Sequence, residues 1–232
     1  MDGRDTRSLC GVRGALAGLM WLVAVQAAQA GAWMRPDGHG FYTFTASLLQ
    51  VEETAREHNE YALFFEYGAR ADLTLGLSGT WTDGFGGEIY GFARWPLPAQ
   101  PTRHLSYEVG LGANTDEVNT YLNLKLGVST ARGYWVGKQY GWMNLDTSLF
   151  LRSNGGATSL KIDGTIGLNV TNSVQVMGQA LIELDENDRS VTWVPSVMWA
   201  VPGRETRIAI GLEKRVGRRA SEGIRLGLWQ DF

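Results

Sequence analysis

The chain has 232 residues, of which 44% are hydrophobic, 11% aromatic and 19% charged, with 30 glycines and a formal net charge of −3. This length suits one domain, and the glycine and aromatic content is more typical of a β protein than of a helical one. The mild negative charge argues against nucleic acid as a partner.

The N-terminus has the order of charged, apolar and small residues that is typical of a secretory signal peptide. An apolar run at 15–25 ends in Ala28-Gln29-Ala30 and follows three arginines, Arg4, Arg7 and Arg13. We therefore predict a signal peptide at 1–30 with cleavage after Ala30, and a single domain at 31–232. A retained anchor is the weaker alternative, because the apolar run is shorter than the roughly 20 residues that a spanning helix needs.

After residue 31 the chain offers no long apolar run, so spanning helices are excluded. Stretches of about ten residues instead alternate between apolar and polar positions, which is the pattern of a strand with one apolar face. One such stretch carries Leu122, Leu124, Leu126 and Val128. About twelve stretches recur, separated by turn-forming residues such as Asp83-Gly84, Asn154-Gly155-Gly156 and Pro202-Gly203.

Alternation alone also fits a soluble sandwich or barrel, in which the apolar face turns inward and Leu124, Leu149 and Ile166 would meet in a packed centre. The polar face, however, is rich in Gly, Ser, Thr and Asn, whereas a solvated outer face carries more charge. Aromatic residues also fall near strand ends, as in the two girdles of a barrel in lipid. One predicted rim has Tyr61, Trp81 and Trp193, and the periplasmic rim has Trp95, Tyr107, Trp135, Trp199 and Trp229. We predict an all-β fold, a transmembrane antiparallel up-and-down β-barrel of about 12 strands.

Two stretches resemble bacterial outer-membrane β-barrel proteins. Residues 65–77, Phe-Glu-Tyr-Gly-Ala-Arg-Ala-Asp-Leu-Thr-Leu-Gly-Leu, resemble a hairpin with a tight periplasmic turn. Residues 223–232, Gly-Ile-Arg-Leu-Gly-Leu-Trp-Gln-Asp-Phe, resemble the closing strand of that group. The resemblance implies the bacterial outer membrane as the location, with the lipid bilayer and lipopolysaccharide as surroundings. It also implies that Phe232 is read by the outer-membrane assembly machinery, and it carries over no catalytic or binding residue.

Charged residues on the polar faces are the candidate functional residues, because a charge inside a membrane barrel must pair or contact water. The predicted lumen-lining set is Glu66, Glu108, Lys125, Asp146, Lys161, Asp163, Glu183, Glu213, Arg215 and Arg225. We expect Lys125 to face Asp146, and Asp163 to meet Lys161. Eight strands make a filled barrel and sixteen an open pore, so about twelve leaves two hypotheses. The first is a passive channel or small transporter for small solutes, and the second is a non-conducting structural or partner-binding barrel.

A third hypothesis is a lipid hydrolase at the rim. It would use His58 with Ser78 or Thr80, although no strained serine turn accompanies them. Calcium binding by the acidic run 185–188 is a further alternative, but the ligand spacing of a known calcium loop is missing. The only cysteine, Cys10, lies in the predicted signal peptide, and three scattered histidines make no transition-metal centre. The sequence therefore predicts no cofactor and no metal.

Overall fold

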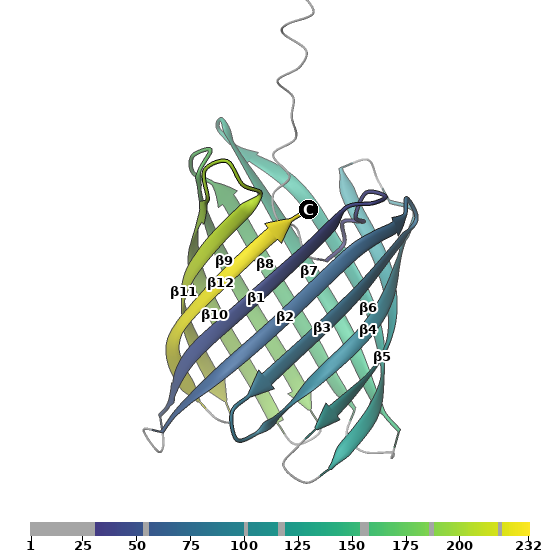
Figure 1. Cartoon of the computed structure of the whole chain (residues 1–232), viewed down its shortest axis with the longest axis vertical. Coiled ribbons are helices and arrows are strands. Elements are labelled where there is room, and N and C mark those ends of the chain that lie inside the picture. The colour runs from purple at the N-terminus through teal and green to yellow at the C-terminus, as the bar shows by residue number, and fades with distance from the viewer. Residues whose placement is uncertain are drawn as a thin grey trace, which may run out of the picture.

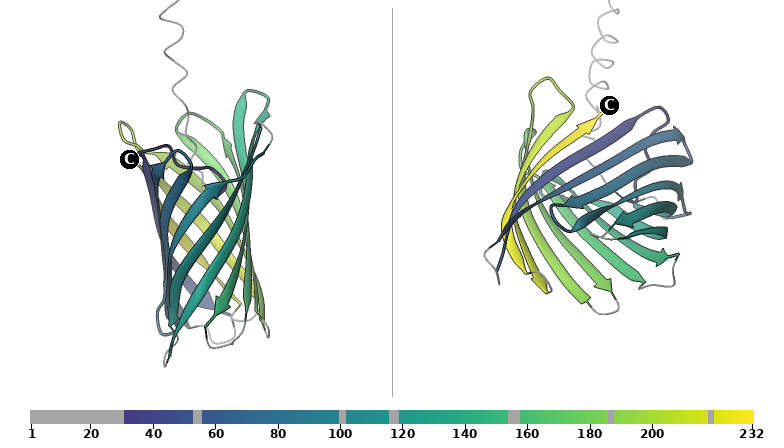
Figure 2. Two further views of the ribbon diagram at one scale, coloured as in Figure 1. Left: turned by 90° about the vertical axis from the view of Figure 1, so that its right-hand side faces the viewer. Right: turned by 60° about the horizontal axis from the view of Figure 1, so that its bottom comes forward.

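The structure, a computed structural model, describes residues 31–52, 56–99, 102–115, 119–153, 158–185, 188–217 and 220–232. Twelve antiparallel strands form one closed barrel, in which each strand pairs with its neighbours in the chain and β12 pairs with β1 (Figures 1 and 2). The strands are β1 Gly40–Val51, β2 Glu57–Arg70, β3 Leu73–Thr82, β4 Gly86–Pro96, β5 Arg103–Thr115, β6 Thr120–Val136, β7 Gln139–Arg152, β8 Ser159–Asn169, β9 Val174–Asp185, β10 Asp188–Ala200, β11 Thr206–Gly217 and β12 Ser221–Asp231. The predicted fold class is confirmed.

The beginning of β1 and the end of β12 lie at one end of the barrel, which we call the terminal end (Figure 1). The other end, where β1 ends and β2 begins, is the opposite end. Two predicted turns, at Asp83-Gly84 and Pro202-Gly203, lie in hairpin connections, and the glycine at each adopts a positive φ, 75° for Gly84 and 73° for Gly203. Glycine suits these positions because it has no Cβ to strain there. The predicted turn at 154–156 and the predicted signal peptide lie outside the described residues.

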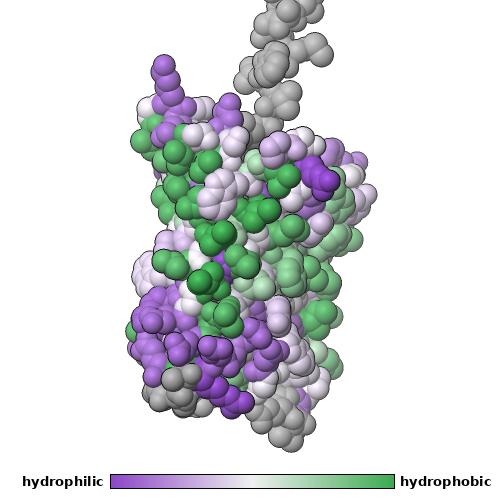
Figure 3. Space-filling view, turned by 60° about the vertical axis from the view of Figure 1, so that its left-hand side comes forward, coloured by the Kyte–Doolittle hydropathy of each residue, from purple (hydrophilic) through white to green (hydrophobic). Residues whose placement is uncertain are grey.

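Apolar side chains cover the exterior of the barrel. Figure 3 shows them over the middle of one face, between hydrophilic side chains toward the two ends. Large apolar residues stand outward at alternate positions with up to 70% exposure, among them Leu63, Leu75, Val109, Leu111, Leu122, Leu126, Ile166, Ile210, Leu212 and Leu226. Ile166 is 49% exposed, and Leu124 lies on the same face of β6 as exposed Leu122 and Leu126. The alternative of a soluble barrel with an inward apolar face is therefore wrong.

The interior of the barrel has two kinds of content. Near the terminal end, large side chains on the inward faces form an apolar cluster of Phe41, Trp142, Met177, Met198, Ala209 and Trp229. Elsewhere the inward positions carry Ser, Thr, Asn, Gln and charged residues, together with the buried side chains of Leu49, Tyr90, Phe92, Phe150 and Val194. Within the described ranges, no helix is long and apolar enough to cross a membrane.

Residues 31–39, which precede β1, have no regular secondary structure and enter the barrel at the terminal end. We call this segment the strap. Ala32 is 2% exposed and Arg35 is 7% exposed, so both are enclosed by the barrel wall. The strap contributes to the site described next.

Candidate functional site in the barrel lumen

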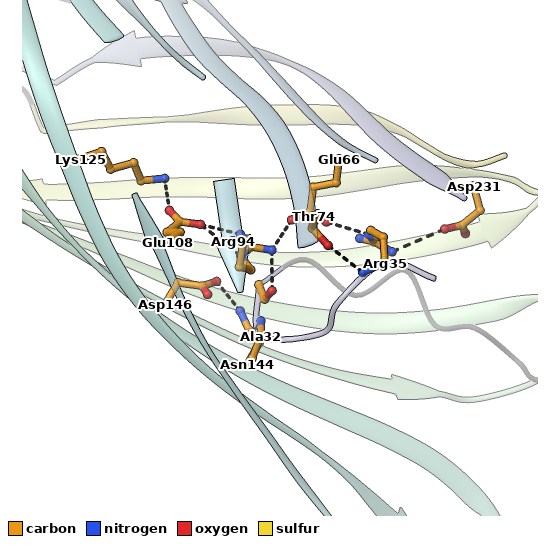
Figure 4. A network of polar contacts seen from close by, with 11 residues as sticks. Ala32, Arg35, Glu66, Thr74, Arg94, Glu108, Lys125, Asn144, Asp146 and Asp231 are labelled. Carbon is orange, nitrogen blue, oxygen red and sulfur yellow. Dashed lines mark hydrogen bonds and ion pairs between the residues drawn. The ribbon is translucent and has the colours of Figure 1, made fainter. Parts of the chain in front are cut away.

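One chain of ion pairs crosses the lumen from the strap to β6, and we call it the strap network (Figure 4). Glu66 on β2 accepts a hydrogen bond from Nε of Arg35 at 2.7 Å and pairs through its other oxygen with Arg94 on β4. Nη2 of Arg94 lies 2.7 Å from Oε2 of Glu108 on β5, and Nζ of Lys125 on β6 lies 2.6 Å from Oε1 of Glu108. The signs alternate along the network, so every charge has an opposite neighbour.

Strand register explains why these side chains meet. Arg94 and Glu108 are directly opposite each other in the β4–β5 ladder and share one face. Glu108 in turn lies opposite Gly127 of β6, where a Cβ would come within 2.5 Å of Cγ of Glu108. The glycine leaves the space that the carboxylate side chain fills. The Glu66 side chain is 0% exposed and that of Arg94 is 3% exposed, so water does not reach either charge. Both charges are therefore stabilised by their ion-pair partners.

A second group, the opposite network, lies on β1, β2, β11 and β12, nearer the opposite end. Glu213 accepts hydrogen bonds from Ser47 Oγ at 2.9 Å and from Arg225 Nε at 3.0 Å. Arg215 lies 2.9 Å from Glu60 through its Nη2 atom. The side chains of Arg215, Arg225 and Glu60 keep between 15% and 20% exposure, so this group has some access to water.

Lys161 on β8 forms a third contact, with Glu88 of β4 at 2.7 Å and Glu183 of β9 at 3.5 Å. Glu88 and Lys161 lie on strands that are not neighbours in the barrel, so this pair spans the lumen rather than following the wall. The side chain of Lys161 is 24% exposed and that of Glu183 is 51% exposed. Lys161 therefore keeps limited access to water, and Glu183 is exposed near the end of β9.

The two ion pairs expected from the sequence are wrong in their partners. Lys125 pairs with Glu108 rather than Asp146, and Lys161 pairs with Glu88 and Glu183 rather than Asp163. Lys125 turns toward β5 rather than β7, and Lys161 lies directly opposite Glu183 in the β8–β9 ladder. The contact of Lys161 with Glu88 crosses the lumen from β8 to β4. Asp146 and Asp163 instead lie opposite each other in the β7–β8 ladder.

Sequence reasoning missed several members of these networks, namely Arg35, Glu60, Glu88, Arg94, Arg207 and Asp231. Period two was a usable signal for Glu60, Arg94 and Asp231, which fall on the inward face with Glu66, Phe92 and Trp229 respectively. Nothing in a strand pattern could have placed Arg35, which precedes the first strand.

Six of the eight residues predicted for the aromatic girdle face outward. Tyr61, Trp81, Trp95, Tyr107, Trp193 and Trp199 lie on the outward faces of their strands. Trp95 and Tyr107 stack at the terminal end with ring centroids 5.3 Å apart, and Tyr61 and Trp81 are opposite each other near the opposite end. This placement is typical of rings at a membrane–water boundary. That these rings contact lipid remains a prediction.

Two of the predicted girdle residues are wrong. Trp229 is 6% exposed and packs inside the barrel against Phe41, with ring centroids 5.8 Å apart. Trp135 is 69% exposed, but it belongs to the inward face of β6 that also carries buried Ser129 and Ala131. Both residues were assigned to the girdle because they lie near the end of a strand. The alternation of side chains along a strand, which decides the face on which each lies, puts both on the inward face.

The residues of the hydrolase hypothesis have other contacts. The His58 ring lies edge-on against Phe85, with centroids 5.8 Å apart. Thr80 hydrogen bonds with Glu88, and Ser78 lies opposite Phe64 and Tyr90 in the ladders. These contacts tie the hydroxyl residues to the lumen wall. Half of the acidic run 185–188 lies outside the described residues, and the described part of the chain holds no group of three or more acidic, histidine or cysteine side chains that could bind a metal ion.

The closing aromatic residue, Phe232, is on the outside of the barrel with 54% exposure. Its ring approaches Tyr42 and Phe65, with centroids 6.2 Å and 6.0 Å away. Its role as an assembly signal remains a prediction.

A closed twelve-stranded barrel with an apolar exterior and a charged interior is the architecture of bacterial outer-membrane β-barrels. No family model matches the sequence, and no curated protein matches it. Solved structures do match. The KdgM porin superposes with a TM-score of 0.56 at 10% identity, covering 83% of this chain and 99% of that one. The NanC porin gives a TM-score of 0.53 at 8% identity, with 81% and 98% covered. The β domain of the Bordetella autotransporter BrkA gives 0.51 at 13% identity, with 84% and 100% covered. At these identities the likeness shows the fold.

Proposed function

We propose that this chain is an outer-membrane channel for small polar solutes, with a lumen that is wet on the side of the opposite end. The observation that carries the proposal is the position of the ionised side chains. Lys161, Glu183, Arg215 and Arg225 retain exposure inside a barrel whose exterior is apolar. A charge at membrane depth that contacts water marks a path for polar solutes more often than a purely structural role.

The mixture of signs supports small solutes of no strong net charge. Both acidic and basic side chains line the lumen, and nearly every one pairs with an opposite charge. Fields from paired charges cancel at a distance, so we expect weak ion selectivity. The likeness to the KdgM and NanC porins supports a channel as well, and a KdgM structure was solved in complex with disordered oligogalacturonate.

A non-conducting barrel is the second candidate, and the apolar cluster favours it. Phe41, Trp142, Met198 and Trp229 have exposures of 6% or less and occupy the interior near the terminal end. Large side chains at that level of the barrel leave little of the cross-section of the lumen open. The two candidate functions differ in whether the residues that fill the terminal end of the lumen can move and open a path.

Current through planar lipid bilayers separates them. The full chain would be exported in bacteria, purified from outer membranes in detergent and added to a bilayer in potassium chloride. We expect discrete current steps, with similar permeability for potassium and chloride. Absence of steps both in this protein and in variants without the strap would reject the channel and leave the non-conducting barrel.

A further inference from the structure

The strap is bonded to the barrel wall on several sides. The carbonyl oxygen of Gly31 accepts a hydrogen bond from Nη1 of Arg94 at 2.6 Å, and the N–H of Ala32 donates to Oδ1 of Asn144 at 3.3 Å. The N–H of Arg35 donates to Oγ1 of Thr74 at 3.0 Å. These partners come from β3, β4 and β7, so the strap spans the lumen rather than lying along one strand.

Side chains of the strap fill the part of the lumen that its backbone spans. Arg35 lies between Glu66 and Asp231, at 2.7 Å and 3.9 Å, with its guanidinium 4.2 Å from the centroid of the Phe41 ring. Trp33 packs against Trp142, with centroids 6.4 Å apart. The strap therefore extends the apolar cluster and the strap network at once, and together they occupy the terminal end of the lumen.

At Gly68, the barrel wall leaves room for the backbone of the strap. A Cβ at Gly68 of β2 would lie 2.1 Å from the carbonyl oxygen of Pro36, which no side chain could tolerate. Gly68 also exchanges backbone hydrogen bonds with the strap, from Gly38 N at 2.9 Å and to His39 O at 2.9 Å. The glycine of the Glu-Tyr-Gly sequence is thus required by the passage of the strap.

Among the described residues of this region, Asp146 has no ion-pair partner. Its Oδ2 atom accepts from the neutral amide of Asn144, and Ser129 also hydrogen bonds with it. Its Oδ1 atom is buried and has no hydrogen-bond partner, and within the described part of the chain no basic nitrogen lies within 4.0 Å of either oxygen. Its partner in the ladder, Asp163, is also acidic. A buried carboxylate in this state costs free energy unless it takes up a proton or a cation joins it.

Gly31 lies beside Asn144, the residue that bonds with Asp146. A Cβ built on Gly31 would lie 2.3 Å from Nδ2 of Asn144, the same nitrogen that bonds with Asp146. Cleavage after Ala30, as the sequence predicts, would turn the Gly31 amide nitrogen into a free ammonium group. Such a group is a strong donor with three hydrogens, compact enough to sit beside a buried carboxylate.

We propose that the strap is a plug for the terminal end of the lumen, and that signal cleavage locks it in place by creating an α-ammonium group at Gly31 that pairs with Asp146. The closure is held by this pair and by the Arg35–Glu66 ion pair. The gating part of this inference rests on the proposed channel function. The position of the new terminus does not, and it is tested separately.

Amine labelling tests the position of the terminus. The exported protein is purified from outer membranes, and its mass is measured to confirm that it begins at Gly31. It is then treated with a small water-soluble acylating reagent, folded and after unfolding in denaturant, and each amine is followed by mass spectrometry. Lys138, exposed in the β6–β7 turn at the same end, is the internal control.

We expect the Gly31 amine to react at least about tenfold more slowly in the folded protein than in the unfolded one, since ion pairing of a buried group limits access. Lys138 should react equally in both. In the Asp146→Asn variant the protection at Gly31 should fall, while Asp72→Asn, at an exposed turn position, should leave it unchanged. A different N-terminal residue, or equal rates at Gly31 in the folded and unfolded protein, would overturn the placement.

Bilayer current tests the closure. Deletion of residues 32–38, or the Arg35→Ala substitution, should raise the mean current several-fold over that of the unaltered protein. Arg70→Ala is the matched control, because Arg70 lies at the same end and its ion pair, with Asp72, is exposed. Equal currents in all four proteins would reject the plug but retain the channel. Silence in all four would reject the channel and leave the labelling result to decide the position of the strap.

Discussion

Gly40 and Phe232 exchange two backbone hydrogen bonds, from Gly40 N to Phe232 O at 2.8 Å and from Phe232 N to Gly40 O at 3.0 Å. The last residue of the chain thereby closes the ladder between the first and last strands. The Phe232 ring lies directly over Gly40, where a Cβ would come within 2.1 Å of the ring. Closure satisfies backbone groups that an open sheet would expose to lipid, where each unpaired group costs several kcal/mol.

Deletion of Phe232 should lower the amount of folded barrel in the outer membrane several-fold. The deletion removes both hydrogen bonds to Gly40 and the aromatic residue that the assembly machinery is expected to read. Folded barrel would be measured as the heat-modifiable band on a denaturing gel. Phe232→Ala keeps the backbone bonds, so a loss with this variant as well assigns the defect to the aromatic ring. Full assembly of the deletion variant would contradict both roles.

The Glu66→Gln substitution should destabilise the barrel by about 3–5 kcal/mol, because it leaves Arg35 and Arg94 in the lumen without their shared carboxylate. Unfolding in denaturant from detergent micelles, followed by tryptophan fluorescence, would measure the change. Asp72→Asn breaks the exposed pair with Arg70 and should cost only about 0–1 kcal/mol. Similar effects of the two substitutions would show that Glu66 is not enclosed as described.

The Leu126→Arg substitution should cost about 2–4 kcal/mol in a lipid bilayer, since Leu126 stands outward at mid-strand with 38% exposure. The free energy of unfolding from phospholipid vesicles would be compared with that of Leu126→Val, which keeps an apolar side chain. An arginine tolerated at this position as well as valine would mean that this face does not contact lipid.

The Lys161→Gln substitution should shift selectivity toward cations, because it leaves Glu88 and Glu183 in the lumen without their common partner. The reversal potential under a potassium chloride gradient would be measured in the Arg35→Ala background, which we expect to conduct. Lys214→Gln serves as the control, since Lys214 pairs with Glu52 and Glu222 among exposed side chains. An unchanged reversal potential with Lys161→Gln would place this lysine outside the conducting path.

Strand number and the outward apolar face were predictable from the sequence because both follow from period two. The same rule predicts the inward position of Trp229, which lies between Gly227 and Asp231 on the polar face of β12. The assignment of Trp229 to the girdle was wrong because it used only the position of the residue near the end of the strand and not the face of the strand on which it lies. Inside a barrel of twelve strands there is room for such a ring, and Phe41 and Trp229 use it.

The strap and the cross-lumen pairs were not predictable from local pattern. Arg35 precedes the first strand, and its partner Glu66 is 31 residues away. The pair Lys161–Glu88 joins positions separated by 73 residues, brought together only when the sheet closes. Contacts of this kind depend on the diameter of the ring and on the reach of long side chains, neither of which a single strand encodes.

The most direct measurement is the bilayer current of the exported protein lacking residues 32–38. A charged lumen closed at its terminal end by the strap predicts frequent current steps that are larger than those of the unaltered protein and weakly selective between potassium and chloride. A silent bilayer, with the barrel shown to be folded by heat modifiability, would contradict a channel through this fold.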